Sequence, residues 1–225
     1  MTGQAQQVHF SRNGDGSVSY LSHAEKFIDL WRDIASSAGA SSAGASDADS
    51  DSAPRVPAKA DFSIRRLQPF LPSYYLAEWT DEGDLVNRLV GSALDDRLGS
   101  PHTGVSFLEN YEGAQRRYFE TFWKQLLDTP CGVMTGRTLH QGPDRKLRMV
   151  GTALPLTDAA GDVRYLCGTA DIVRDFQEET GVKVGERRVY IDYVQYIDLG
   201  FGIPANRPDP AEFNALTDQM ATAAE

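Results

Sequence analysis

The sequence predicts an α+β fold with five antiparallel strands in one sheet, helices on one face of that sheet, and an amphipathic helix at the N-terminus. Strand-like runs come in two groups joined by short, turn-rich connections, and connections that short require antiparallel neighbours. Two helical stripes of apolar residues stand apart from these runs. The 225 residues, 41% of them hydrophobic, suffice for one domain with extensions or for two small domains.

The N-terminal part of the chain is predicted to hold one helix between two flexible stretches. Residues 1–20 are polar and expected to be mobile, and the Ser/Ala/Gly/Asp-rich residues 37–58 are typical of a flexible linker. Between them, the helix at 21–36 starts with Ser22 and Glu25, the pattern of a capping box. An apolar stripe follows at helical spacing: Phe27, Leu30, Trp31, Ile34 and Ala35.

This stripe needs a surface to cover it. An antiparallel sheet often has one face on its own helices and the other open. We therefore expect Trp31 to dock its helix on the open face of the sheet. A helix that binds a partner protein is the alternative interpretation.

A domain is predicted over residues 59–175. It should begin with a short helical or turn segment stopped by Pro72, and its first hairpin should place Gly83 at positive φ. A short helix is expected at 91–98 and a long one at 112–128. The strand candidates are rich in apolar residues and bounded by turn residues: 73–79, 85–90, 133–140, 146–156 and 163–173.

Residues 176–225 are predicted to form a C-terminal extension outside that domain. Segment 188–199 alternates apolar residues as a strand does. Asp209, Pro210 and Glu212 have the residue types of a helix start. The extension should therefore add one strand and one short helix.

Charge and composition exclude several classes of protein. The net charge is −10 with no cluster of Lys and Arg, which argues against binding nucleic acid or an anionic membrane surface. No apolar run approaches the roughly 18–20 residues of a membrane helix, and the N-terminus lacks the pattern of a secretory signal. The two cysteines, Cys131 and Cys167, fit a reducing compartment. We expect a cytoplasmic protein.

Catalytic and metal-binding motifs are missing from the sequence. It contains no nucleophile elbow, zinc-protease motif or phosphate-binding glycine loop. The four histidines are scattered, and the two cysteines are too far apart in sequence for a C-x-x-C motif. The sequence therefore predicts a protein without enzymatic activity.

The order of the elements and several local sequence motifs resemble the PAS domain family, and in particular PAS-like proteins of alphaproteobacteria. The resemblance rests on the helix around Trp31 and on four stretches: PRVPAKADF, NRLVGSALDDRLGS, HTGVSF and ALPLTDAAGDV. It implies a sensory or signalling module. Some members bind haem through a histidine, and His102 is the candidate nearest the expected cavity; a role in the turn is the alternative. No cofactor is assigned.

Aromatic and methionine side chains on the helical half and the facing strands suggest a pocket for a small apolar or amphipathic ligand. The candidate ligand-binding residues are Tyr111, Tyr118, Phe122, Met134, Met149 and Cys167. A filled core is the alternative for this cluster. Arg88 and Arg148 interrupt apolar strands, and each would either anchor a carboxylate or phosphate or face solvent.

The leading hypothesis is a stand-alone module that binds a small ligand or a protein partner and regulates by that interaction. The alternative is a ligand-free structural adaptor that works through dimerisation or partner binding. In either case the Trp31 helix and the strand at 188–199 carry apolar stripes, and we expect them to form a homodimer interface.

Overall fold

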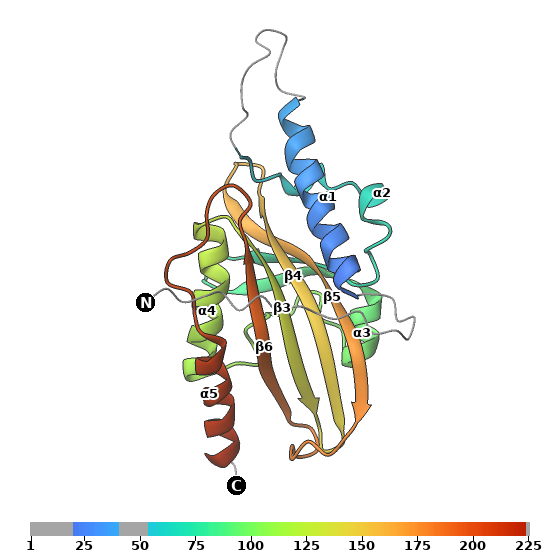
Figure 1. Cartoon of the computed structure of the whole chain (residues 1–225), viewed down its shortest axis with the longest axis vertical. Coiled ribbons are helices and arrows are strands. Elements are labelled where there is room, and N and C mark those ends of the chain that lie inside the picture. The colour runs from blue at the N-terminus through green and yellow to red at the C-terminus, as the bar shows by residue number, and fades with distance from the viewer. Residues whose placement is uncertain (1–19, 41–53, 224–225) are drawn as a thin grey trace.

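The structure of the chain is a computed structural model that describes residues 20–40 and 54–223. Its centre is one antiparallel sheet with strand order β2-β1-β5-β4-β3-β6 (Figure 1). The strands are β1 (Tyr74–Trp79), β2 (Leu85–Val90), β3 (Gly132–Gln141), β4 (Arg145–Thr157), β5 (Val163–Gln177) and β6 (Arg187–Ile197). Residues 1–19 of the predicted mobile N-terminus and residues 41–53 of the predicted linker lie outside the described residues, whereas Tyr20 is the first residue of a helix.

The sheet has six strands, which corrects the predicted count of five. The sixth is β6, which pairs with β3 along its whole length, from Gly132 opposite Ile197 to Gln141 opposite Arg187. The reason lies in β3: β4 covers only one of its edges, and the other edge offers a row of unpaired backbone groups. The alternating segment predicted as part of an extension is therefore the strand that completes the sheet.

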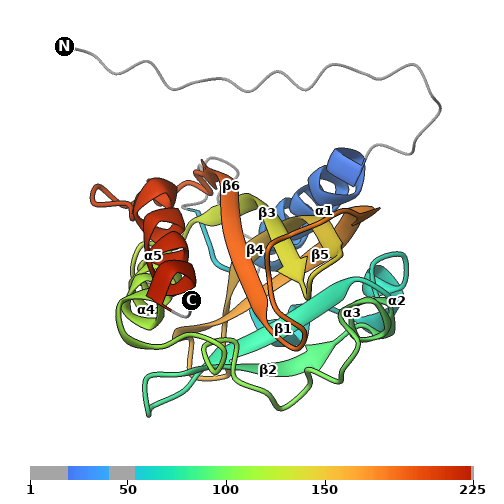
Figure 2. The same cartoon turned by 90° about the horizontal axis from the view of Figure 1, so that it is seen from below.

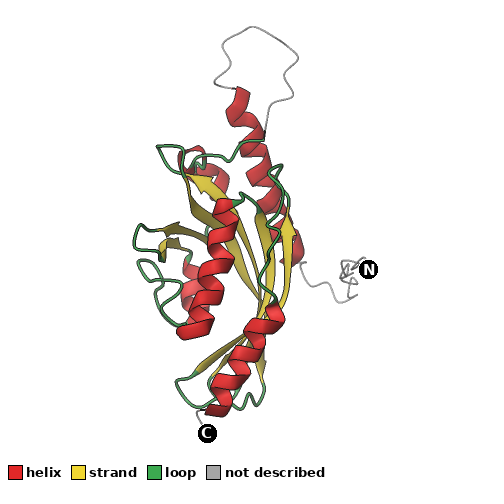
Figure 3. Cartoon of the chain, turned by 90° about the vertical axis from the view of Figure 1, so that its left-hand side faces the viewer, coloured by secondary structure: helices red, strands yellow, loops and turns green. Residues whose placement is uncertain are grey.

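Helices cover both faces of the sheet. The inner face, as we name it, carries α3 (Ser92–Leu98), α4 (Gly113–Asp128) and α5 (Pro210–Ala223). The outer face carries α1 (Tyr20–Ala40) and the short α2 (Ile64–Leu67). Figure 2 shows α1 on the side of β3 and β4 opposite to α4 and α5, and Figure 3 shows α4 and α5 in front of the strands.

Docking of α1 on the outer face confirms the expectation for Trp31. This side chain is 2% exposed, and its indole Nε1 donates a hydrogen bond of 2.9 Å to the carbonyl oxygen of Pro155. Pro155 lies beyond the part of β4 that pairs with β3, so its missing N–H breaks no hydrogen bond with that strand. A hydrogen bond between His23 and Asp171, with 2.8 Å between Nδ1 and Oδ2, ties the start of α1 to β5.

Both ends of α1 differ from the prediction. The helix begins at Tyr20, before the expected cap at Ser22, and continues to Ala40, so residues 37–40 of the predicted linker are helical. Alanine and serine can continue a helix that packing on the sheet already stabilises. The low-complexity composition of residues 37–40 therefore does not end the helix. At the far end of the predicted linker, Val56 is buried in the outer-face cluster.

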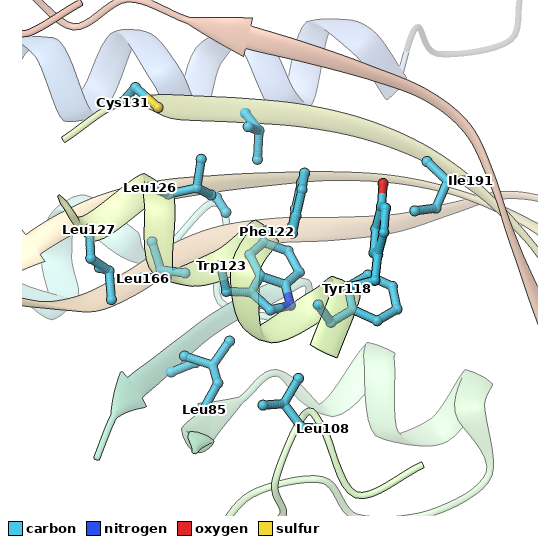
Figure 4. Close-up of a cluster of buried hydrophobic side chains, with 14 of the residues drawn as sticks. Leu85, Leu108, Tyr118, Phe122, Trp123, Leu126, Leu127, Cys131, Leu166 and Ile191 are labelled. Atoms are coloured by element: carbon cyan, nitrogen blue, oxygen red, sulfur yellow. The ribbon is translucent and has the colours of Figure 1, made fainter. Parts of the chain in front are cut away.

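The inner face is filled over its α4 half by one aromatic cluster (Figure 4). It combines α4 side chains with Leu166 of β5, Ile191 of β6 and Phe213 of α5. The α4 members are Tyr118, Phe119, Phe122, Trp123, Leu126 and Leu127. The long helix predicted from its apolar stripe thus packs against both the domain and the C-terminal segment.

Both edges of the sheet are covered. At β2, Asn87 N–H donates to the Val105 carbonyl at 3.0 Å, and Gly104 N–H, at a φ of 84°, donates to the Asn87 carbonyl at 2.7 Å. At β6, the Asn214 side chain bonds both the N–H and the carbonyl of Ile191, at 2.8 and 3.0 Å. The apolar stripes that suggested a dimer are therefore occupied within the chain. The homodimer itself stays a prediction.

Candidate ligand cavity

A cavity of about 420 Å³ opens on the inner face, beside the part filled by α4. Its walls come from α3, the segment 102–111, α5 and the strands of the sheet. Its volume lies within the roughly 300–1,000 Å³ of small-molecule sites, which are typically apolar with a few polar groups. The apolar lining consists of Val90, Leu94, Leu98, Phe107, Leu139, Met149, Ala170, Val189, Met220 and Ala221.

Strand alternation and ring contacts hold this lining in place. Arg137 and Leu139 of β3 both face inward because side chains two residues apart share one face of a strand. Phe107 is fixed by its N–H, which donates to the Leu85 carbonyl at 2.7 Å, and by an edge-to-face contact with Trp123 at 5.1 Å between ring centroids. Tyr111 leans on Phe119, with 4.5 Å between centroids.

Arg137 is the charged group at the floor of the cavity. A Cβ atom at Gly151 would stand 3.6 Å from its Nη2, so the guanidinium lies across the glycine of the neighbouring strand. Its Cζ is 5.7 Å from the centre of the Phe107 ring. The Nε of Arg137 is buried without a hydrogen-bond partner among the described residues.

Three arginines of the sheet pair with carboxylates, unlike Arg137. Arg88 pairs with Glu78 at 2.7 Å, Arg145 with Asp175 at 2.8 Å, and Arg164 with Asp81 at 2.8 Å. Within the described part of the chain, no carboxylate pairs with Arg137. The Arg137 side chain is partly buried and has no charged partner, so it has an unused capacity to bind an anion.

Two tyrosines flank this arginine as neutral groups. Burial raises the pKa of Tyr75 and of Tyr111 above the ordinary tyrosine value, and the nearby charge of Arg137 opposes the shift only partly. Tyr75 donates its hydroxyl hydrogen to the Thr152 carbonyl at 2.7 Å. At neutral pH both phenols therefore stay protonated and leave the charge of Arg137 uncancelled.

Three further hydrogen bonds link residues along the walls of the cavity. Gln115 Nε2 of α4 donates to Thr217 Oγ1 of α5 at 2.9 Å, which links the two helices beside the cavity. His102 Nδ1 lies 3.1 Å from Asp95 Oδ1, and the His102 N–H donates to the same oxygen at 3.0 Å. His102 thus borders the cavity as the residue that ties the turn after α3 to that helix.

The structure brings only two of the six predicted ligand-binding residues into this cavity, Tyr111 and Met149. Tyr118 and Phe122 belong to the filled aromatic cluster. Met134 lies three residues from Arg137 on β3, an odd separation that places it on the other face of the sheet. Cys167 lies in the outer-face cluster with Trp31.

Both thiols are inert in this environment. Burial raises the pKa of Cys131 to about 12, and burial also raises the pKa of Cys167. A neutral, inaccessible thiol is a poor nucleophile and a poor ligand for metals. Among the described residues, no group of three or more His, Cys, Asp or Glu side chains is arranged to hold a metal ion.

The residue that sequence reasoning missed is Arg137. Arg88 and Arg148 drew notice because they interrupt apolar strands, yet Arg88 pairs with Glu78 and Arg148 is exposed to solvent. Arg137 stands between a glycine and a threonine, where no apolar run marks it as buried. Its separation from Val133 and Leu139 by even numbers of residues is the signal that could have placed it inward.

Comparison with known proteins gives one match. A family model described as PAS domain matches residues 25–170, which reach from α1 to the middle of β5. No curated protein and no solved structure matches the chain. Among the described helices, none combines the length and the apolar character that crossing a membrane requires.

Proposed function

The chain belongs to the PAS domain family, and from this premise we propose that it is a sensory domain that binds a small ligand in the inner-face cavity. PAS domains are in general sensory or signalling modules. The observation that carries the proposal is the cavity itself, because about 420 Å³ of apolar-walled space holds an unpaired arginine. A ligand-free adaptor would have no use for such a space, since unfilled apolar volume costs stability.

A route from the cavity to α1 supports a signalling role. Leu94 and Ala170 border the ligand cavity and also a smaller cavity of about 210 Å³ that His23 and Asp171 line. A ligand that contacts Leu94 or Ala170 therefore acts beside the His23–Asp171 hydrogen bond that ties α1 to β5. Binding energy that differs between two positions of α1 would shift the population between them.

The proposal also covers the group of PAS proteins, the cellular location and the output of the chain. The motif NRLVGSALDDRLGS, at β2 and α3, favours the alphaproteobacterial group of PAS-like proteins. Two inert free cysteines favour a cytoplasmic location. The output is regulation of a protein partner by binding, without enzymatic activity.

Native mass spectrometry of the full chain tests this function. The chain is exposed to a small-molecule extract of bacterial cells, desalted and weighed. We expect one bound molecule per chain. Met149→Trp should abolish binding because the larger side chain enters the cavity that Met149 lines.

Val150→Trp is the matched control, because it adds a similar bulk at the next residue of β4, whose side chain faces the other way. It should retain the bound molecule. A wild-type chain that carries no molecule would instead favour the structural adaptor. Equal loss of binding in both variants would show that Met149→Trp acts through stability and not through the cavity.

A further inference from the structure

The charged residues that line the cavity are mostly positive, whereas the chain as a whole is negative. The chain has a net charge of −10, whereas the charged residues that line the cavity are three arginines, Arg137, Arg187 and Arg188, and one glutamate, Glu186. A concave site with positive charge and low-dielectric walls concentrates anions. The charge distribution thus selects for a negatively charged ligand.

Of these arginines, Arg137 is the one without a hydrogen bond or an ion pair to another described residue. Arg187 donates to the Leu98 carbonyl at 3.0 Å, and Arg188 lies 4.0 Å from Glu186. Arg137 has a buried Nε without a partner and no neighbouring carboxylate among the described residues. One free guanidinium matches one carboxylate, which it can grip with two parallel hydrogen bonds.

The surroundings of Arg137 also define the rest of the ligand. Phe107, Leu139 and Met149 form apolar walls beside the guanidinium. The other two arginines that line the cavity have contacts of their own, Arg187 with the Leu98 carbonyl and Arg188 with Glu186. A phosphate or a dicarboxylate would leave negative charge facing these walls, at a large desolvation cost. An apolar chain or ring would instead gain from contact with them.

Resting on the proposed function, we propose that the cavity recognises an organic monocarboxylate with an apolar body. The carboxylate pairs with the guanidinium of Arg137, and the body lies against Phe107, Leu139 and Met149.

Matched acid and amide probes test this class of ligand. Isothermal titration of the full chain uses octanoate against octanamide, and phenylacetate against phenylacetamide, since each pair differs in charge at nearly constant shape. We expect at least one acid to bind about tenfold or more tightly than its amide, because hydrogen bonds to charged groups are the strong ones. This ratio is measured on the wild-type chain and depends on no variant.

Arginine variants assign the effect to its residue. Arg137→Gln should weaken binding of the acid by about 10- to 100-fold and leave binding of the amide unchanged. Arg137→Lys keeps the charge without the planar fork and should lie between. Arg148→Gln is the control, because this arginine is exposed on the neighbouring strand and should change neither affinity.

The outcomes separate the two proposals. Equal affinity for acid and amide overturns the carboxylate inference and leaves the proposed function standing. The same holds if neither probe pair binds while native mass spectrometry finds a bound molecule. If neither probe binds and no bound molecule is found, the proposed function fails together with this inference.

Discussion

Trp31→Ala should lower the free energy of unfolding by about 3–5 kcal/mol, because it empties a fully packed site on the outer face. The indole is 2% exposed and is hydrogen-bonded to Pro155 through its Nε1. Domains are stable by only about 5–15 kcal/mol, so the loss should be evident as a large drop in the urea midpoint.

Two variants calibrate this loss. Trp31→Phe keeps most of the apolar area but removes the donor to Pro155, so it should cost about 1–3 kcal/mol. Asp29→Ala alters an exposed residue of the same helix, which pairs with Arg32 alone among the described residues, and should change little. If Trp31→Ala unfolds at the same urea concentration as Asp29→Ala, α1 does not dock on the sheet.

Phe213→Ala should cost a similar 3–5 kcal/mol, since this ring is fully buried although it lies near the end of the chain. Its centroid lies 4.7 Å from that of Phe119 and 6.0 Å from that of Tyr111. Loss of the ring should loosen α5 and also the Tyr111 wall of the cavity. Equilibrium unfolding in urea measures the first effect.

Gln219→Ala, at an exposed position of α5, is the control for helix propensity and should leave the midpoint within about 0.5 kcal/mol of wild type. A Phe213→Ala variant as stable as this control would mean that α5 is a detachable extension. A large loss would mean that residues 176–225 belong to the cooperative unit that includes the sheet.

Much of the fold follows from local patterns. The strands begin and end within a few residues of the predicted bounds, because alternation and turn residues such as Gly83, with a φ of 78°, mark them clearly. Local sequence patterns do not show with which edge of the sheet a given strand pairs. The pairing of β6 with β3 connects segments about fifty residues apart, so the strand was predicted but its place in the sheet was not.

The candidate site was predicted less well, for a related reason. An aromatic stripe on a helix has the same sequence pattern whether it lines a cavity or fills a core. Phe122 fills a core because β6 and α5 pack against α4, and both come from the segment thought to lie outside the domain. Tyr111 and Met149 line the cavity, which lies beside the part of the inner face that α4 fills.

A crystal structure of the full chain grown with octanoate tests the central claim most directly. The account predicts electron density for the ligand in the inner-face cavity, with its carboxylate within hydrogen-bond distance of the Arg137 guanidinium and its alkyl chain against Phe107 and Met149. A ligand bound on the outer face, or a cavity closed by collapse of Phe107 and Tyr111 onto the sheet, would contradict it.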